Sequence, residues 1–458
     1  MGRLLERIKR LKGPIMAVAG LGAVLSGFIG YWTTYQTVKK AAAPQRIVAS
    51  VPADAAALSI AVLPFANRSG DPKQAYFADG ITETLTSDLS RIRDAVIISS
   101  TTAFAYKDKP VTATEVGKEL GVRFVLQGSV QRSGDSIRIN AQLADTASNV
   151  QLWSESFDGD QSNLFALQEL ITTRIANSIG REMIIAAARE SEKRKVSPKV
   201  ADLILRARAL ELKPRTRKTF EEIEAWYRQA LAAEADNTTA MVGLARSLVL
   251  QAGNFGFTMD ERARDRKFLE GRDLALRARQ LDPENPGIYL PLSQYARFHD
   301  DFPGYRRAAE TLYSLQPKNP SACSLMAALY IDSGEPAKAI DFLNRAISLD
   351  PRHPADIVLV NMGRAYFMLG DNDAAIEWYL KTLEASPAQA NAYAWLAMAY
   401  AVKGEDAKAR AAVADLRRAQ PNFKLSEFRK PQPSSPAAYK EYFEGRYLPA
   451  GRKAGLPE

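Results

Sequence analysis

The chain has 458 residues, and a composition of 46% hydrophobic and 25% charged residues is typical of a folded protein rather than a disordered one. The single cysteine, Cys323, excludes an intrachain disulfide, and two histidines, His299 and His353, are too few for a zinc site of Cys and His ligands. The net charge is +9, but residues 58–160 hold 10 basic and 13 acidic residues, a balance of −3 that argues against a nucleic-acid partner there.

The amino-terminal residues have the pattern of a membrane anchor. Residues 1–12 are predominantly basic, and the next charged residue is Lys39. The uncharged run is long enough, at roughly 1.5 Å per residue, to cross the hydrocarbon core of a bilayer as a helix. We therefore predict a cytoplasmic basic segment at 1–12, a single transmembrane helix at 13–35 and an Ala- and Pro-rich linker at 36–57.

The charges around this helix predict its orientation. More basic residues precede it than follow it, so the positive-inside rule places the amino terminus in the cytoplasm and the bulk of the chain in the periplasm, anchored in the inner membrane. Gly22, Ser26 and Gly30 recur four residues apart and would let two such helices pack as a homodimer. A cleaved signal peptide is the alternative, although Lys39 and Lys40 precede its small-residue site.

The pattern of residues 58–185 predicts an α/β domain. Apolar runs at 58–65 and 95–100 are typical of buried strands, and apolar residues recur at helical spacing over 75–92 between them. Strict alternation over 136–145 predicts a further strand with one buried face. The predicted order β-α-β-α-β-β-β-α indicates a mixed sheet.

The stretch "PFANRSGDPKQAYFADGITETL" at 64–85 places a glycine loop between a strand and a helix, as phosphate-binding loops do. It lacks both the Gly-Lys-Ser/Thr of a Walker loop and the Gly-x-Gly-x-x-Gly of a dinucleotide site, and Asp71-Pro72 is typical of a tight turn. Asp79 and Glu83 share a helix face, but such a pair is more commonly solvated than bound to a metal. We predict no catalytic residue, no metal ligand and no cofactor.

These residues carry a resemblance to a known family. "SIAVLPFANRSGDPKQAYFADGITETLTSDLSR", "VRFVLQGSVQRSGDSIRINAQLADTASNVQLWSESFDGD" and "LFALQELITTRIANSI" resemble the TolB-like (FlgO-like) domain of bacterial membrane proteins over about 59–182. The resemblance implies a non-catalytic α/β domain between a membrane span and tetratricopeptide repeats. Family members often carry a class III adenylate cyclase or a winged-helix domain before the span, and we expect this chain to lack both.

The second half of the sequence repeats itself. Pro283, Pro317, Pro351, Pro387 and Pro421 recur at intervals of 34 to 36 residues, with Gly, Tyr and Ala in step. This period is the tetratricopeptide signature of helix pairs, in which Gly ends the first helix and Pro follows the second. The pattern predicts an all-α solenoid over 199–421. Its six predicted hairpins span 199–235, 236–283 (with an insertion), 284–317, 318–351, 352–387 and 388–421, and a capping tail follows at 422–458.

Stacked hairpins form a curved solenoid whose concave groove is lined by the first helix of each pair. Cys323 falls where such a helix packs on its neighbour, so we expect a buried structural thiol. A carboxylate clamp, by which some of these repeats hold a peptide terminus, is incomplete, because only Asn361 is present. Helical spacing places the following residues in the groove: Gln294, Arg297, Phe298, Arg364, Phe367, Met368 and Met398.

A groove that is both apolar and basic suits an extended or helical peptide. The leading hypothesis is therefore a non-catalytic membrane-anchored scaffold that binds protein partners, through the solenoid and the TolB-like domain, in envelope signalling or assembly. The alternative is a regulatory or degenerate relative of an adenylate cyclase, or of a membrane-bound transcriptional regulator. No nucleic acid is expected as a partner.

Overall fold

The computed structural model describes residues 55–458 except 93, 134–135, 161–163, 194–198, 214, 256–258, 388, 426–427 and 429. The predicted transmembrane helix at 13–35, its orientation and the packing of Gly22, Ser26 and Gly30 lie outside the described residues. Within the described part, no helix is both long and apolar enough to cross a membrane.

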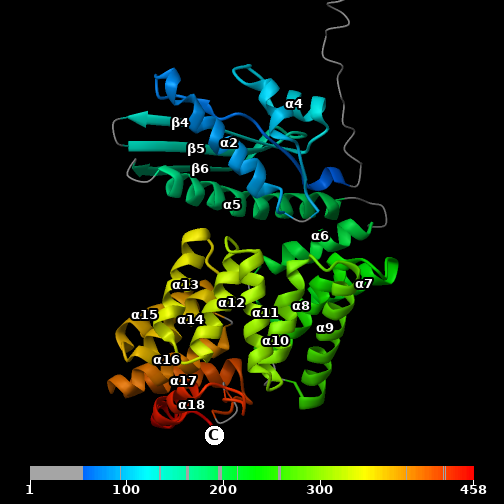
Figure 1. The fold of residues 1–458 in the computed structure, drawn as a ribbon. Helices are drawn as coiled ribbons and strands as arrows, with labels where there is room; N and C mark the ends of the chain where they lie inside the picture. Colours follow the sequence, from blue (N-terminus) through cyan, green and yellow to red (C-terminus); the bar gives the residue numbers. More distant parts are fainter. Residues whose placement is uncertain are drawn as a thin grey trace, which may run out of the picture. The chain divides into compact units, whose positions relative to one another are not determined.

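The first described part of the chain contains a mixed β-sheet (Figure 1). Its strands are β1 (Ser59–Val62), β2 (Ala66–Asn67), β3 (Val96–Ile97), β4 (Phe124–Ser133), β5 (Ser136–Asp145) and β6 (Val150–Asp160). The strand order is β3-β1-β4-β5-β6, with β2 paired to β4; β1 is parallel to both β3 and β4, whereas β4-β5-β6 is antiparallel. The predicted mixed sheet is therefore confirmed.

This part of the described chain also contains helices. They are α2 (Ala75–Leu89), α3 (Ser100–Ala103), α4 (Ala113–Leu120) and α5 (Leu164–Lys193), with 3₁₀ turns at Ala55–Leu58, Pro72–Gln74 and Phe104–Tyr106. Ile81 and Leu85 of α2 and Ile175 and Ile179 of α5 are fully buried in one core with alternate residues of β4 and β5. Helix α5 continues beyond residue 185, where the sequence pattern predicted the domain to end.

The rest of the described chain is helical, and its consecutive helices pack in pairs (Figure 1). The pairs are α6 (Val200–Glu211) with α7 (Arg217–Ala233), α8 (Thr238–Phe255) with α9 (Glu261–Leu281), α10 (Tyr289–Phe298) with α11 (Phe302–Leu315), α12 (Pro320–Asp332) with α13 (Pro336–Leu349), α14 (Asp356–Leu369) with α15 (Asn372–Ala385), and α16 (Ala390–Lys403) with α17 (Asp406–Ala419). The residues predicted as an insertion mainly lengthen α8 and α9. The helical repeat is thus also confirmed.

Glycine and proline residues terminate several of these helices for steric reasons. Gly370 and Gly404 adopt φ of +92° and +81° and end α14 and α16 in the left-handed region, which glycine enters without strain. Pro351 and Pro421 follow the last residues of α13 and α17 by two positions, where a helix cannot continue. These signals explain why the helix pairs could be read from the sequence.

The chain after the last pair folds back onto the solenoid. It forms α18 (Ala437–Tyr442), a π-turn (Phe443–Tyr447) and α19 (Leu448–Ala454). Phe428, Phe443 and Tyr447 join Trp395 of α16 in one aromatic core, with Trp395 5.1 Å from Tyr447 between ring centroids. The tail therefore covers the apolar face of the final pair, as a solenoid end requires.

Candidate functional site

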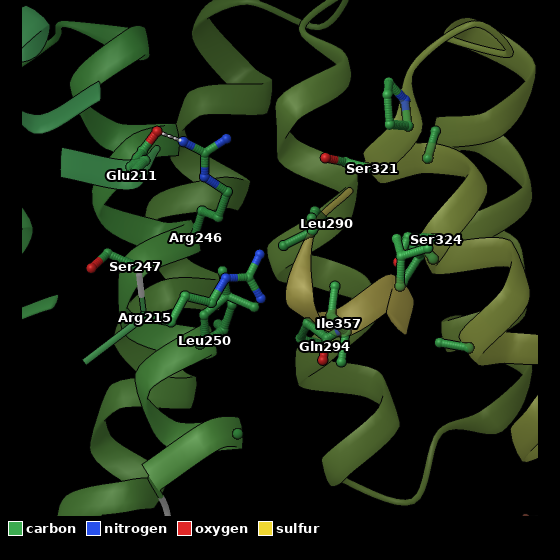
Figure 2. Close-up of a pocket in the computed structure, with 18 of the residues that line it drawn as sticks. Glu211, Arg215, Arg246, Ser247, Leu250, Leu290, Gln294, Ser321, Ser324 and Ile357 are labelled. Carbon is green, nitrogen blue, oxygen red and sulfur yellow. Dashed lines mark hydrogen bonds and ion pairs between the residues drawn. The ribbon is translucent and has the colours of Figure 1, made fainter. Parts of the chain in front are cut away.

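The main candidate site is a cavity of about 360 Å³ in the helical part (Figure 2). Its walls come mainly from the first helices of the first five pairs: α6, α8, α10, α12 and α14. In Figure 2, Arg246 and Leu250 on α8 lie opposite Leu290 and Gln294 on α10. The inner faces of successive first helices thus meet around one space, as expected for a curved stack.

One wall of this cavity carries an arginine–glutamate pair. Arg246 on α8 donates to Glu211 at the end of α6, and the Tyr227 hydroxyl donates to the same carboxylate at 2.9 Å. The Coulombic attraction of Glu211 outweighs burial and raises the pKa of the Arg246 guanidinium. Arg215, in the loop after α6, lies 3.7 Å from the Asp356 carboxylate. Arg246 is therefore held on the α6–α8 side of the cavity, whereas Arg215 reaches α14.

The opposite wall carries two arginines that share one carboxylate. Arg297 on α10 and Arg364 on α14 both form ion pairs with Asp332, at the end of α12, and Arg364 Nη2 lies 3.2 Å from Asp332 Oδ1. Arg364 also donates to Asn361 Oδ1 at 3.0 Å and lies over the Trp395 ring. Burial opposes the charge of Arg297, but Asp332 outweighs it and raises the pKa of that guanidinium.

Two donors on this wall have no acceptor. Asn361 and Arg364 are 1% and 2% exposed, and neither Asn361 Nδ2 nor Arg364 Nε has a hydrogen-bond partner among the described residues. Buried donors in folded proteins are nearly always paired, and each unpaired group is destabilising. Both residues line the cavity, but these two donor atoms are themselves buried behind its surface.

Apolar side chains complete the lining. Leu250, Leu290 and Ile357 contribute aliphatic surface, and Ser321 and Ser324 lie at the start of α12 (Figure 2). The cavity thus combines apolar surface, hydroxyl and amide groups and guanidinium groups, and it falls in the usual size range of ligand sites.

The structure sorts the seven predicted groove residues into two groups. Gln294, Arg297, Phe298 and Arg364 all line the cavity. Phe367 and Met398 are fully buried in the core shared by α14, α16 and the tail, so the prediction that they face the groove is wrong. Met368 packs against the core between α12 and α14 and is not part of the cavity lining.

Sequence reasoning missed the cationic residues of the first two pairs. Arg215 lies in a loop, and Arg246 lies in a pair whose repeat pattern is interrupted by longer helices. Arg246 precedes the buried Ser247 and Leu248 on α8. Without a clear register, however, the inward face of α8 could not be distinguished from its neighbours.

The carboxy-terminal tail contacts the turns of three successive helix pairs. Ser434 Oγ accepts from Phe302 N at 3.1 Å, at the turn between α10 and α11. The backbone at Ala438 and Tyr439 passes against Gly334, between α12 and α13. Arg446 donates to the Phe367 carbonyl oxygen at 2.8 Å, near the end of α14. A small cavity of about 60 Å³ between the tail and α10 shares Arg297 with the larger cavity.

The glycine loop of the α/β part has the geometry of a turn. Ser69 N donates to Asn67 Oδ1 at 3.0 Å, and Gly70 adopts a φ of +77°. Asp79 accepts from Lys107 Nζ at 2.7 Å, and among the described residues no three metal-ligating side chains lie together. The strand end and residues 106–109 border a shallow polar cavity of about 510 Å³ over β4 and β5.

Cys323 is fully buried on α12, as expected of a structural thiol. Burial raises the pKa of its thiol to about 11. The thiol is therefore protonated at neutral pH and is a poor nucleophile.

Fold and cavity together define a tetratricopeptide-type helical solenoid that follows a mixed α/β domain. Residues 320–388 match the tetratricopeptide repeat family model. Residues 56–174 match the model "HilA/YgeH-like transcriptional regulator, second domain". The second match overlaps the region that resembles TolB-like domains but names a different family, and the TolB-like assignment remains a prediction.

Among known proteins, a segment of 177 residues is 42% identical to "Putative adenylate cyclase 3" of Rhizobium meliloti (strain 1021). The match covers 38% of this chain and 30% of that protein's length. Among solved structures, the Cut9-Hcn1 complex of APC/C is 14% identical over 62% of this chain and 49% of its own, with a TM-score of 0.41. A tetratricopeptide-repeat protein of Thermus thermophilus is 16% identical over 44% of this chain and 98% of its own, with a TM-score of 0.34.

Proposed function

We propose that this protein is a non-catalytic scaffold that binds a polypeptide segment in the cavity of its helical repeat. The observation that carries this proposal is the convergence of five first helices on one cavity with both apolar and charged walls. Leu250, Leu290 and Ile357 offer contacts to aliphatic side chains, while Gln294 and Ser321 offer hydrogen bonds to a peptide backbone.

Photocrosslinking from inside the cavity tests this proposal. A photoreactive phenylalanine analogue at Gln294 is expected to crosslink a polypeptide in cells, because that side chain borders the cavity. The matched control is the same analogue at Leu380, which is 47% exposed on the second helix α15 and is outside the cavity lining. The proposal fails if the two positions give the same adducts or if Gln294 yields none.

We place the protein in the inner membrane, with residues 1–12 in the cytoplasm and the α/β domain and solenoid in the periplasm. The uncharged run at 13–35, the excess of basic residues before it and the resemblance to TolB-like domains support this topology. A reporter enzyme that works only in the periplasm is fused after residue 58. We expect this fusion to be active. Activity of a cytoplasm-specific reporter at the same position contradicts it.

A second candidate is a regulatory subunit in cyclic-nucleotide signalling. The observation that favours it is the 42% identity to a segment of a protein whose name says adenylate cyclase. In this case the chain itself turns over no nucleotide but co-purifies with a cyclase and changes its rate. Cyclase turnover by the purified chain alone would rule out both the scaffold and the regulatory subunit.

A further inference from the structure

We propose that the cavity selects polypeptide segments that carry carboxylate side chains. This inference rests on the proposed function and adds to it the chemistry of the partner. It starts from the charges at the cavity. The lining contains five basic residues, Lys213, Arg215, Arg246, Arg297 and Arg364, and one acidic residue, Glu211. Asp332 and Asp356 pair with the arginines, so the local balance is 5 − 3 = +2.

The excess positive charge is most buried at the wall formed by α10, α12 and α14. Two guanidinium groups meet there, and in the described part of the chain Asp332 is the carboxylate that lies within ion-pair distance of Arg297 and Arg364. The side chains of Arg297 and Arg364 are only 14% and 3% exposed. One positive charge is therefore buried without a counter-ion of its own, an arrangement that is costly unless an anion supplies the missing charge.

Two hydrogen-bond donors directly behind this wall are also unpaired. Asn361 Nδ2 and Arg364 Nε have no acceptor, although both side chains are almost fully buried. Both groups donate hydrogen bonds and accept none in these positions. A carboxylate bound at this wall would supply the missing negative charge to the guanidinium groups of Arg297 and Arg364, and its two oxygens are hydrogen-bond acceptors.

The remaining lining favours acidic side chains of a polypeptide over a nucleic-acid backbone. Leu250, Leu290 and Ile357 lie among the polar groups and match the apolar parts of a peptide. Glu211 stands at the opposite wall beside Arg246 and would repel a continuous row of phosphates. Arg246 is already paired with Glu211 and Arg215 with Asp356, so the positive charge left unmatched among the arginines lies at the wall of Arg297 and Arg364.

The test uses the full chain purified in detergent and two fluorescent decapeptides that differ only in four positions, which are Glu in one and Gln in the other. The Glu peptide is expected to bind at least about tenfold more tightly, because a charged hydrogen bond at a buried site is worth that factor or more. Its affinity is expected to fall as NaCl is raised.

Gln294→Glu provides the decisive variant. It places a carboxylate one turn before Arg297 on α10 without changing side-chain size, so it supplies the missing counter-ion from the protein itself. We expect it to fold and to weaken binding of the Glu peptide by about tenfold more than binding of the Gln peptide. The matched control is Gln280→Glu on the exposed surface of α9, which adds the same charge away from the cavity and is expected to change neither affinity.

The possible outcomes separate this inference from the proposed function. Equal binding of the two peptides to the wild type overturns the preference for carboxylates but leaves peptide binding intact. Binding of neither peptide also overturns it, and crosslinking from position 294 then decides the proposed function. Displacement of the Glu peptide by a single-stranded oligonucleotide at equal charge concentration would instead assign the cavity to nucleic acid.

Discussion

Single glycines set how closely neighbouring helices approach in the repeat. At Gly363 on α14, an added Cβ would lie 2.3 Å from Tyr379 Cε1, well inside van der Waals contact. Tyr379 is fully buried on α15, and its ring stacks on the Trp395 ring with the centroids 6.5 Å apart. The absence of a side chain at this position is therefore a packing requirement, not a requirement for backbone freedom.

We expect Gly363→Ala to lower the free energy of unfolding by about 1–3 kcal/mol, since overpacking forces ring and backbone shifts. Urea denaturation monitored by circular dichroism measures the change. Gly445→Ala is the control, because nothing lies within 4 Å of its added Cβ and alanine is the better helix former. Equal stability of Gly363→Ala and the wild type would show that the Tyr379 ring moves freely.

The buried thiol of Cys323 gives a second prediction at this scale. Because burial raises its pKa to about 11, the thiolate fraction is very small at pH 8. Maleimide is expected to label Cys323 slowly in the native protein and fully in guanidinium chloride, as measured by intact mass. Rapid stoichiometric labelling of the native protein would contradict the burial of α12 at this residue.

At the scale of helices, one carboxylate joins three elements of the first two pairs. Glu224 on α7 accepts from Lys267 Nζ on α9 at 2.8 Å and from Gln251 Nε2 on α8 at 3.0 Å. Arg228, one turn later on α7, pairs with the same carboxylate. Burial raises the pKa of Glu224, but these donors outweigh it, and the pKa is lowered from its ordinary value of 4.5.

This lowered pKa predicts a pH-dependent contribution to stability. A carboxylate whose pKa is lower in the folded state stabilises above its unfolded pKa, and that stabilisation is lost as pH falls through the folded pKa. We expect Glu224→Gln to reduce the free energy of unfolding by about 1 kcal/mol at pH 7, with the difference from the wild type shrinking below pH 4.5. Denaturation at pH 7 and pH 3 measures it, and a deficit that is constant across this range would contradict the ionic contribution.

The boundaries of these helices could be predicted from the sequence. Whether an individual side chain borders the cavity or is buried in the core could not. Proline and glycine act locally, so the ends of α14 and α16 follow from residues next to them. Helical spacing gives only the face on which a side chain lies. Arg364 and Phe367 are three residues apart on one face of α14, yet Arg364 borders the cavity and Phe367 is covered by Trp395 and the tail.

At the scale of the whole repeat, the carboxy-terminal tail is more than a cap on the last pair. The sequence predicted a capping tail at 422–458, but nothing in its composition indicates contacts with pairs three, four and five. Those contacts join residues 74 to 134 positions apart, which no local pattern encodes. Arg446 is the clearest example, because it donates to Phe367 O and Asn372 Oδ1 and lies 4.9 Å from the Phe367 ring centroid.

We expect Arg446→Ala to lower the free energy of unfolding by about 1–3 kcal/mol, because it removes charge-assisted hydrogen bonds and leaves the Phe367 carbonyl without that donor. Hydrogen exchange is expected to quicken around the turn between α14 and α15. Arg452→Ala is the control, since Arg452 pairs with Glu458 in an exposed position. Unchanged exchange at this turn in Arg446→Ala would show that the tail does not support the fifth pair.

The path of the tail also limits how this repeat can evolve. Solenoids ordinarily gain and lose units by duplication or deletion, because each unit touches only its neighbours. Here Ser434, Tyr439 and Arg446 contact three consecutive turns in order. An extra unit between α10 and α15 would move these three turns apart and break at least one of the contacts, so descendants of this chain are expected to keep the number of units in that interval.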